Sequence, residues 1–156
     1  MADSNPSEAV TDQEVTIKRV FDAPPELVWR AFTDPDQVAK WWGPHGFTTP
    51  RDRITIELTE GGAFNFTMIE DATGTEHHAE GSFTEVEEPK RLAFSSEVSG
   101  EVELTAVSIV TFSEFEPGKT EVIVRQSMKT TEEIAEGSQE GWSQQFERLA
   151  ELLAQG

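Results

Sequence analysis

Few residues in this sequence have the type and spacing needed for acid–base or metal chemistry. Cysteine is absent, which excludes disulfides, thiolate metal sites and a cysteine nucleophile. The three histidines, His45, His77 and His78, show neither the His-x-His nor the His-x3-His spacing of a metal site, and adjacent histidines on a strand point to opposite faces. We expect no metal, no cofactor and no catalytic motif. His77, Glu80 and Arg19 are the remaining candidates for acid–base groups.

Four polar residues stand where the alternation of a strand calls for an apolar one: Arg19, Ser96, Ser108 and Gln126. A buried polar group without a partner costs about 1–3 kcal/mol, so a dry core disfavours such residues. A ligand pocket typically contains a few polar groups among apolar side chains. Alternatively, these residues pair with one another, hold a water molecule or leave the core at a bulge.

We interpret Arg19, Ser108 and Gln126 as the polar anchors of a cavity. Its walls would be apolar, mostly aromatic side chains: Trp42, Phe64, Phe66, Met68, Phe94, Phe112, Trp142 and Phe146. Such a cavity favours a small hydrophobic or amphipathic molecule, and an arginine inside it would favour a carboxylate or phenolate. Trp41 and Trp42 would lie about 100° apart on a helix, so either one of them lines the pocket or both fill the junction with the sheet.

The order of predicted elements places these residues around one sheet. Alternating apolar residues predict a strand over residues 14–21, followed by two short helices up to residue 42. Six more strands follow between residues 54 and 128, with hairpin-length links that indicate an antiparallel sheet. A sheet of this kind must cover its apolar face, and we expect the C-terminal helix to cover it. A pocket is expected where the two short helices meet the sheet.

The C-terminal segment has the pattern of one long helix. Thr130 and Glu133 form a capping-box pattern, and apolar residues recur at spacings of 4, 3 and 4 from Trp142. Gly137 and Gly141 fall within this helix, where each costs about 1 kcal/mol relative to alanine. We therefore expect a compensating feature, such as a bend or the close approach of another backbone.

Composition narrows the class of protein and of partner. A chain of 156 residues that is 36% hydrophobic suits one domain with its own core. Its net charge of −18 opposes binding to nucleic acid or to an anionic membrane. No apolar run exceeds three residues, and the first twelve residues lack the basic and apolar parts of a signal peptide. We expect a flexible tail over residues 1–12, a single domain over residues 13–156 and a cytoplasmic location.

Several short motifs together resemble a known family. They are FDAPPELVWRAFTDP at residues 21–35, WWGP at 41–44, GGAF at 61–64, GSFTEV at 81–86 and GW at 141–142. The sequence resembles, over residues 14–154, the family named for the C-terminal domain of the activator of the heat shock protein 90 ATPase. That family lies within the START-like (SRPBCC) superfamily. The resemblance implies an α+β helix-grip fold, in which a curved antiparallel sheet of six to seven strands surrounds a long C-terminal helix. It implies no catalytic motif.

Three functions remain open at this stage. The first is a binding module that holds a small hydrophobic ligand without chemistry. The second is a partner of heat shock protein 90, in which the acidic surface would meet a basic patch on the chaperone. The third is an enzyme such as a polyketide cyclase or dehydratase, which the absence of tyrosine and of a clear His–acid pair makes less favoured.

Overall fold

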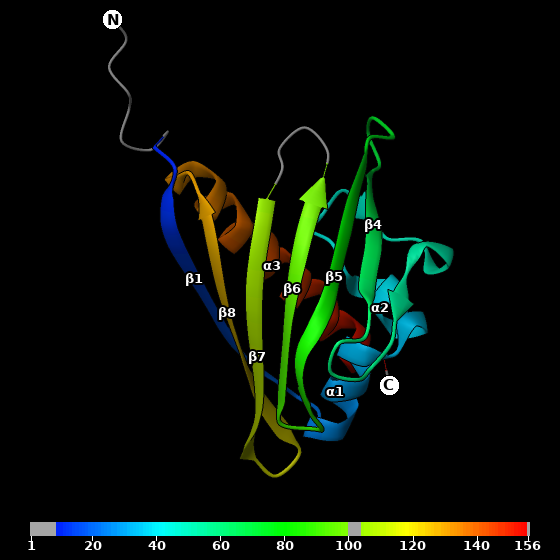
Figure 1. The fold of residues 1–156 in the computed structure, drawn as a ribbon. Helices are drawn as coiled ribbons and strands as arrows, with labels where there is room; N and C mark the ends of the chain where they lie inside the picture. The colour runs from blue at the N-terminus through cyan, green and yellow to red at the C-terminus, as the bar shows by residue number, and fades with distance from the viewer. Residues whose placement is uncertain (1–8, 100–103, 156) are drawn as a thin grey trace, which may run out of the picture.

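Long stretches of alternating apolar and polar residues form a curled antiparallel sheet, which is the largest element of the protein (Figure 1). The computed structural model describes residues 9–99 and 104–155. The strands are β1 (Thr11–Phe21), β2 (Phe47–Thr48), β3 (Thr55–Ile56), β4 (Phe64–Glu70), β5 (Glu76–Glu87), β6 (Arg91–Ser99), β7 (Leu104–Glu116) and β8 (Lys119–Thr130). Their order in the sheet is β1-β8-β7-β6-β5-β4-β2, and β3 pairs with β4.

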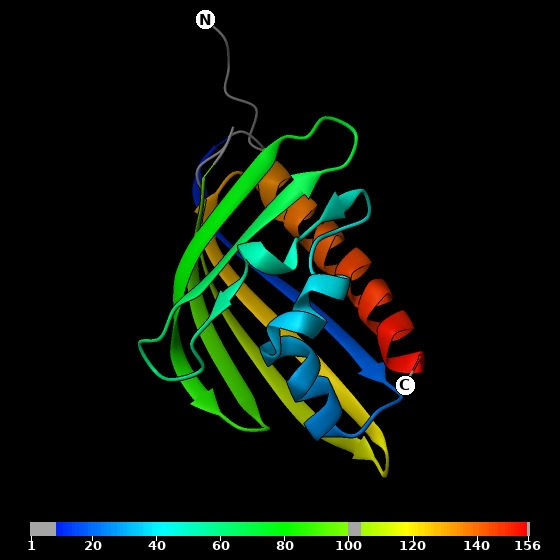
Figure 2. The same ribbon diagram turned by 90° about the vertical axis from the view of Figure 1, so that its right-hand side faces the viewer.

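In the described residues, three α-helices lie on the concave side of this sheet (Figure 2). They are α1 (Pro25–Thr33), α2 (Pro35–Trp41) and α3 (Glu132–Ala154), and a 3-10 turn covers Arg51–Arg53. α1 and α2 each begin at a proline, which suits the first helical position because its missing N–H needs no partner there. The carboxylate of Asp34 caps α2 by accepting the N–H of Asp36 at 2.9 Å.

The cap of α3 lies one residue later than the sequence pattern predicted. The hydroxyl of Thr131 accepts the N–H of Ile134 at 3.2 Å. Thr130 is instead the last residue of β8, where it is buried and pairs with Thr11 of β1. The predicted capping box at Thr130 is therefore wrong, because the strand extends to that residue and uses it in the ladder.

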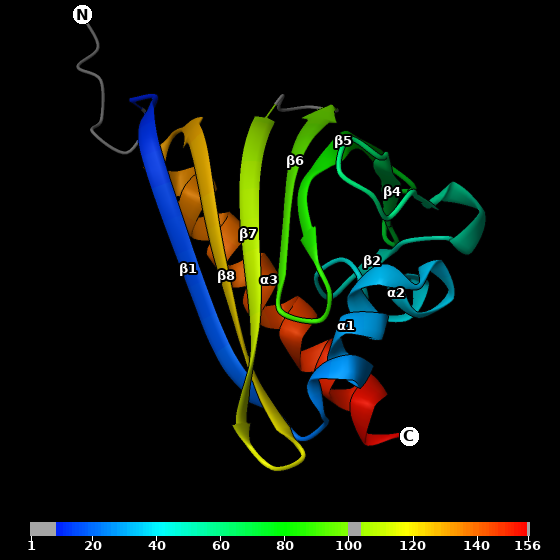
Figure 3. The same cartoon turned by 60° about the horizontal axis from the view of Figure 1, so that its bottom comes forward.

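The sheet register explains which residues form the core. β1 and β8 pair along their whole length, from Thr11 opposite Thr130 to Phe21 opposite Thr120. Alternate residues of these strands, such as Val15, Ile17 and Val124, point to the helices and are buried. α3 packs over β1 and β8, while α1 and α2 lie beside its C-terminal part (Figure 3).

The architecture confirms the predicted α+β helix-grip fold, with two short helices after the first strand and a long terminal helix around which the sheet curls. β1 begins at Thr11, inside the segment expected to be a tail, and residues 1–8 of that segment lie outside the described residues. In the described part of the chain, no helix has both the length and the apolar character that crossing a bilayer requires.

Candidate functional site

A pocket of about 480 Å³ lies between the first half of α3 and one end of the sheet. Side chains from β4 to β8, from α3 and from the segment after α2 line it. Six of the residues predicted for a cavity are among them: Trp42, Phe66, Met68, Phe94, Gln126 and Trp142. The pocket is where the curled sheet and the helix diverge, and its wall is predominantly apolar.

The two tryptophans after α2 have separate roles. Trp41 is fully buried, and its indole N–H donates to the carbonyl of Ala31 at 2.8 Å. Trp42 lines the pocket and meets the rings of Phe66 and Trp142 edge to face, at centroid distances of 5.3 and 5.4 Å. Such edge-to-face pairs hold aromatic rings in fixed orientations, so this part of the wall is preformed.

Two glycines of α3 also line the pocket. A Cβ atom added at Gly137 would meet no atom within 4 Å, and one added at Gly141 would meet only the side chain of Pro44, at 3.9 Å. Of the two compensating features suggested for these glycines, close approach of another backbone is therefore excluded at both positions within the described residues. Their missing side chains leave open space on the face of α3 that borders the pocket.

The remaining apolar residues predicted for the cavity lie deeper. Phe64, Phe112 and Phe146 are buried and do not line this pocket, and Phe112 lies instead beside a second pocket at the opposite end of the strands. Phe112, for example, packs edge to face against Trp29 and Phe32. Sequence alternation places all these rings on the inner face of the sheet or helix, but only the tertiary packing separates core from pocket wall.

Of the three predicted polar anchors, Ser108 and Gln126 come together and Arg19 does not join them. Arg19 has the inward phase of β1 but is exposed, with its guanidinium carbon 5.6 Å from the centroid of the Phe21 ring. β1 is an edge strand, and a long side chain there can lead its charged end into water. Ser108 is fully buried and bonded to Gln126, whose Nε2 donates to the serine hydroxyl at 3.0 Å.

The amide of Gln126 has a partner on each side. Besides its bond to Ser108, its Oε1 accepts the hydroxyl of Ser138 on α3 at 2.6 Å. Two of the four polar residues in apolar strand phases therefore pair with each other, which is one of the alternatives stated for them. Ser96 is the fourth: it lines the pocket, is 6% exposed and makes no side-chain hydrogen bond within the described residues.

Gln145 is a pocket residue that sequence reasoning missed. Its Oε1 accepts the backbone N–H of Gly43 at 2.9 Å, and it is 6% exposed at the pocket wall. The sequence contains a signal for this residue: Gln145 lies three residues after Trp142 and four before Leu149, within the buried stripe of α3. A polar residue in such a stripe indicates a specific hydrogen bond or a polar ligand contact.

His77 is the only ionisable side chain that lines this pocket in residues 9–99 and 104–155. Its Nε2 lies 2.8 Å from the Oε2 of Glu70, and its ring packs beside that of Phe47. The other two acid–base candidates, Glu80 and Arg19, are exposed and do not line the pocket. Within the described ranges, no three histidine or acidic side chains are placed to hold a metal ion.

Helix α3 holds the loop that closes one side of the pocket. Arg148 donates from Nη1 to the carbonyls of Gly43 at 2.7 Å and of Phe47 at 3.3 Å. The side-chain Oε1 of Gln144 accepts the backbone N–H of His45 at 3.0 Å. Together with the bond from Gly43 to Gln145, these contacts fix residues 42–47, which supply Trp42 and two other wall residues, against the helix.

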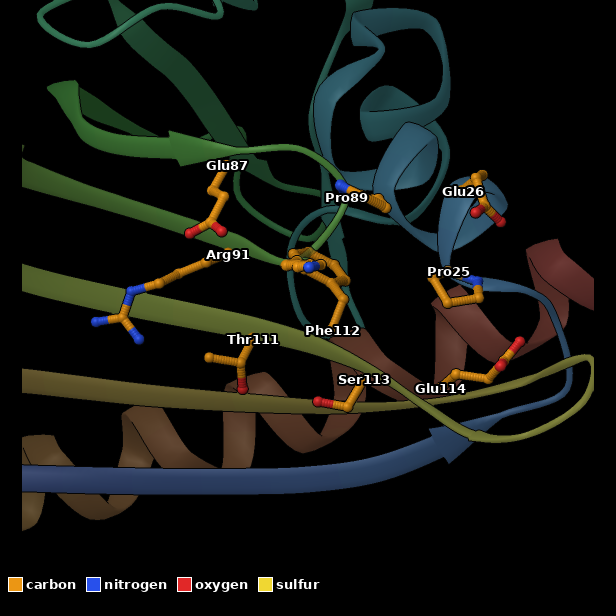
Figure 4. Close-up of a pocket in the computed structure, with 10 residues that line it drawn as sticks. Pro25, Glu26, Glu87, Pro89, Arg91, Thr111, Phe112, Ser113 and Glu114 are labelled. Atoms are coloured by element: carbon orange, nitrogen blue, oxygen red, sulfur yellow. The ribbon is translucent and has the colours of Figure 1, made fainter.

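A second pocket, of about 540 Å³, lies at the opposite end of the strands. Figure 4 shows the side chains around it, which come from the β5–β6 turn, β7 and the beginning of α1. Charged residues of both signs, including Glu87, Arg91 and Glu114, make up much of its edge. Water and mobile charges compete for any ligand there, so this pocket is less suited to an apolar molecule.

Comparisons with known proteins agree with the fold. The model of the family described as Activator of Hsp90 ATPase homolog 1-like protein matches residues 22–154. No curated protein sequence matches the chain.

Solved structures share the architecture along nearly the whole chain. A protein from Chromobacterium violaceum is 26% identical, with a TM-score of 0.81 and coverage of 89% of this chain and 95% of its own. A protein from Nitrosomonas europaea is 29% identical, with a TM-score of 0.75 and coverage of 91% and 94%. The AHSA1 protein from Silicibacter pomeroyi is 21% identical, with a TM-score of 0.80 and coverage of 91% and 98%, and supports the fold alone.

Proposed function

Because this chain belongs to the Activator of Hsp90 ATPase homolog 1-like family, within the START-like superfamily, we propose that it binds one small apolar or amphipathic molecule in the pocket between α3 and the sheet. The family and the fold support a ligand-binding domain in general. The observation that carries the finer proposal is a preformed aromatic wall, with Trp42, Phe66 and Trp142 around an open space of about 480 Å³.

The size and lining of this pocket suit such a ligand. Small-molecule sites usually measure about 300–1,000 Å³ and combine an apolar lining with few polar groups. Transfer of apolar surface from water into the pocket provides about 25 cal/mol per Å² buried, which is the driving force for binding. Gly137 and Gly141 support the proposal because alanine would favour the helix at both positions but would add atoms on the pocket side.

We further propose that the partner of this protein is a small molecule and that the protein acts in the cytoplasm, in line with the expectations from the sequence. Neither the chaperone partnership nor the cyclase-like or dehydratase-like activity is favoured by a specific feature of the described residues. Of the three acid–base candidates, Arg19 and Glu80 lie away from the pocket, whereas His77 lines it with its Nε2 2.8 Å from the carboxylate of Glu70. The chaperone appears only in the description of the family.

Binding can be tested with a compact apolar probe, 2-isopropylnaphthalene, by calorimetric titration and thermal unfolding. A probe present at 100 times its dissociation constant should stabilise the protein by about 2.7 kcal/mol, which raises Tm by about 5–11 °C for a domain of this size. Native mass spectrometry of protein from its own host would identify a co-purified ligand.

A matched pair of variants locates the site. Gly137→Leu should weaken binding, because the new side chain enters open space on the pocket face of α3. Gln139→Leu adds a similar side chain at an exposed position on another face of the same helix and should leave binding unchanged. Equal affinities for both variants and the unaltered protein would refute the proposed site.

A further inference from the structure

The polar groups of the pocket differ in whether they already have partners. We propose that the pocket selects neutral ligands that carry a hydrogen-bond acceptor, such as a ketone, ester or amide carbonyl, and that Gln145 and Ser96 bind this acceptor. The inference rests on the proposed function and adds the chemical class of the ligand. It depends on which donors remain free, on where they lie and on the charge around them.

The orientation of the Gln145 amide is determined by a backbone group. The N–H of Gly43 can only donate, so the atom 2.9 Å from it must be the carbonyl oxygen of the glutamine side chain. The Nε2 group, with two N–H donors, is then on the other side of the amide. Within the described residues this group makes no hydrogen bond, and since every fully buried side-chain nitrogen there has a partner, it must be accessible from the pocket that Gln145 lines.

Ser96 supplies a second free group from the opposite wall. It lies on the inner face of β6, whereas Gln145 lies on α3, so the two residues approach the pocket from the sheet and from the helix. The Ser96 hydroxyl makes no hydrogen bond within the described residues, and since no fully buried side-chain oxygen there lacks a partner, this hydroxyl must be accessible from the pocket that it lines. A ligand acceptor in the pocket can therefore bind it without displacing a protein partner.

Other polar residues at the pocket do not offer the same opportunity. Both sides of the Gln126 amide are occupied, by Ser108 and by Ser138. A ligand that hydrogen-bonded to this amide would have to displace Ser108 or Ser138, so the net gain in binding free energy would be small. Gln145 and Ser96 are therefore the residues through which the pocket can distinguish one ligand from another.

The electrostatic surroundings disfavour an anionic ligand. No lysine or arginine is among the described residues that line the pocket, and the Nε2 of His77 is already 2.8 Å from the carboxylate of Glu70. The whole chain carries a net charge of −18. A carboxylate entering this pocket would lose its hydration without gaining a counterion, so the sequence-based expectation of an acidic ligand, which depended on Arg19, does not extend to this pocket.

Three probes of similar shape separate these effects: 2-acetylnaphthalene, 2-isopropylnaphthalene and 2-naphthoate. Calorimetric titration of the unaltered protein should show that the acetyl compound binds about three- to tenfold more tightly than the isopropyl compound, the value of one hydrogen bond. The naphthoate should bind more weakly than either. Equal affinity for the acetyl and isopropyl compounds, or tighter binding of the naphthoate, would overturn the inference while leaving the proposed function intact.

Variants assign the preference to the two residues. Ser96→Ala removes the free hydroxyl and should reduce the acetyl preference without lowering Tm, because that hydroxyl has no partner to lose. Gln145→Glu keeps an oxygen for Gly43 but replaces the free donor by an acceptor, and it should abolish the preference. Ser95→Ala, on the opposite face of β6, is the control and should change nothing.

The outcomes separate the two proposals. A preference for the acetyl compound that persists in both Ser96→Ala and Gln145→Glu would refute the roles of these residues. Failure of 2-isopropylnaphthalene and 2-acetylnaphthalene to bind the unaltered protein at all would refute the proposed function, and the inference with it.

Discussion

Arg148 provides a sharp test of how the pocket wall is held in place. Its guanidinium lies against the loop of residues 42–47 and donates to the carbonyls of Gly43 at 2.7 Å, of Trp42 and Phe47 at 3.3 Å, and of Lys40 at 3.4 Å. Arg148→Met keeps most of the apolar stem and removes the two nitrogens, Nη1 and Nη2, that make these four contacts. We expect the loop to loosen and the protein to lose stability.

The size of this loss follows from the geometry. Only the bond to Gly43 is short, and a hydrogen bond to a charged group contributes about 1.5–3 kcal/mol. The three longer contacts add little. We therefore expect a loss of about 2–3 kcal/mol, which lowers Tm by about 4–12 °C for a domain of this length.

The assay is denaturant and thermal unfolding of Arg148→Met beside Arg125→Met, which makes the same substitution at an exposed position on the outer side of β8. Binding of 2-isopropylnaphthalene should weaken in Arg148→Met alone, since residues 42–47 carry part of the pocket wall. If the two variants have the same stability and affinity, the guanidinium does not hold the loop and the reasoning is refuted.

Three further outcomes can be measured. Gly137→Ala should raise the free energy of unfolding by about 0.5–1 kcal/mol in denaturant titrations, because a Cβ there meets no atom within 4 Å; a loss would mean that the space is not open. Thr131→Ala should cost about 0.5–2 kcal/mol through the lost cap of α3, and Thr131→Ser should not. A hydrogen bond from Arg53, together with its charge, lowers the pKa of Glu76, so this carboxylate adds stability above its unfolded pKa that is lost as the pH falls through the folded pKa. Arg53→Gln should raise the pKa of Glu76 in an NMR titration, and an unchanged value would contradict this interpretation.

The fold could be predicted from the sequence because its signals are local. The alternation of apolar and polar residues in β1 and β8, like the apolar stripe of α3, shows which side of each element is apolar. The apolar side of a long helix that follows an antiparallel sheet has few places to pack other than the sheet. The error in the predicted cap of α3 arose because two neighbouring residues have the same capping ability. Thr130 and Thr131 are both able to cap α3, and only the pairing of Thr130 with Thr11 decides between them.

The candidate site was less predictable because its polar chemistry depends on distant partners. Arg19 has the inward phase of its strand, yet its place on an edge strand takes it into water. Ser108 and Gln126 have the same phase signal as Ser96, but the first two are bonded to each other and Ser96 faces the pocket. Alternation indicates which face a side chain is on and contains no information about its hydrogen-bond partner.

The amino-acid sequence by itself determined the order of the elements, the helix-grip fold and the apolar character of the interior, since each follows from the spacing of residues a few positions apart. The tertiary structure alone decided which rings border the open space and which donors remain unpaired. Gln145 illustrates the reason: its amide is oriented by Gly43, which lies 102 positions away in the chain and becomes its neighbour only when α3 packs against the loop after α2.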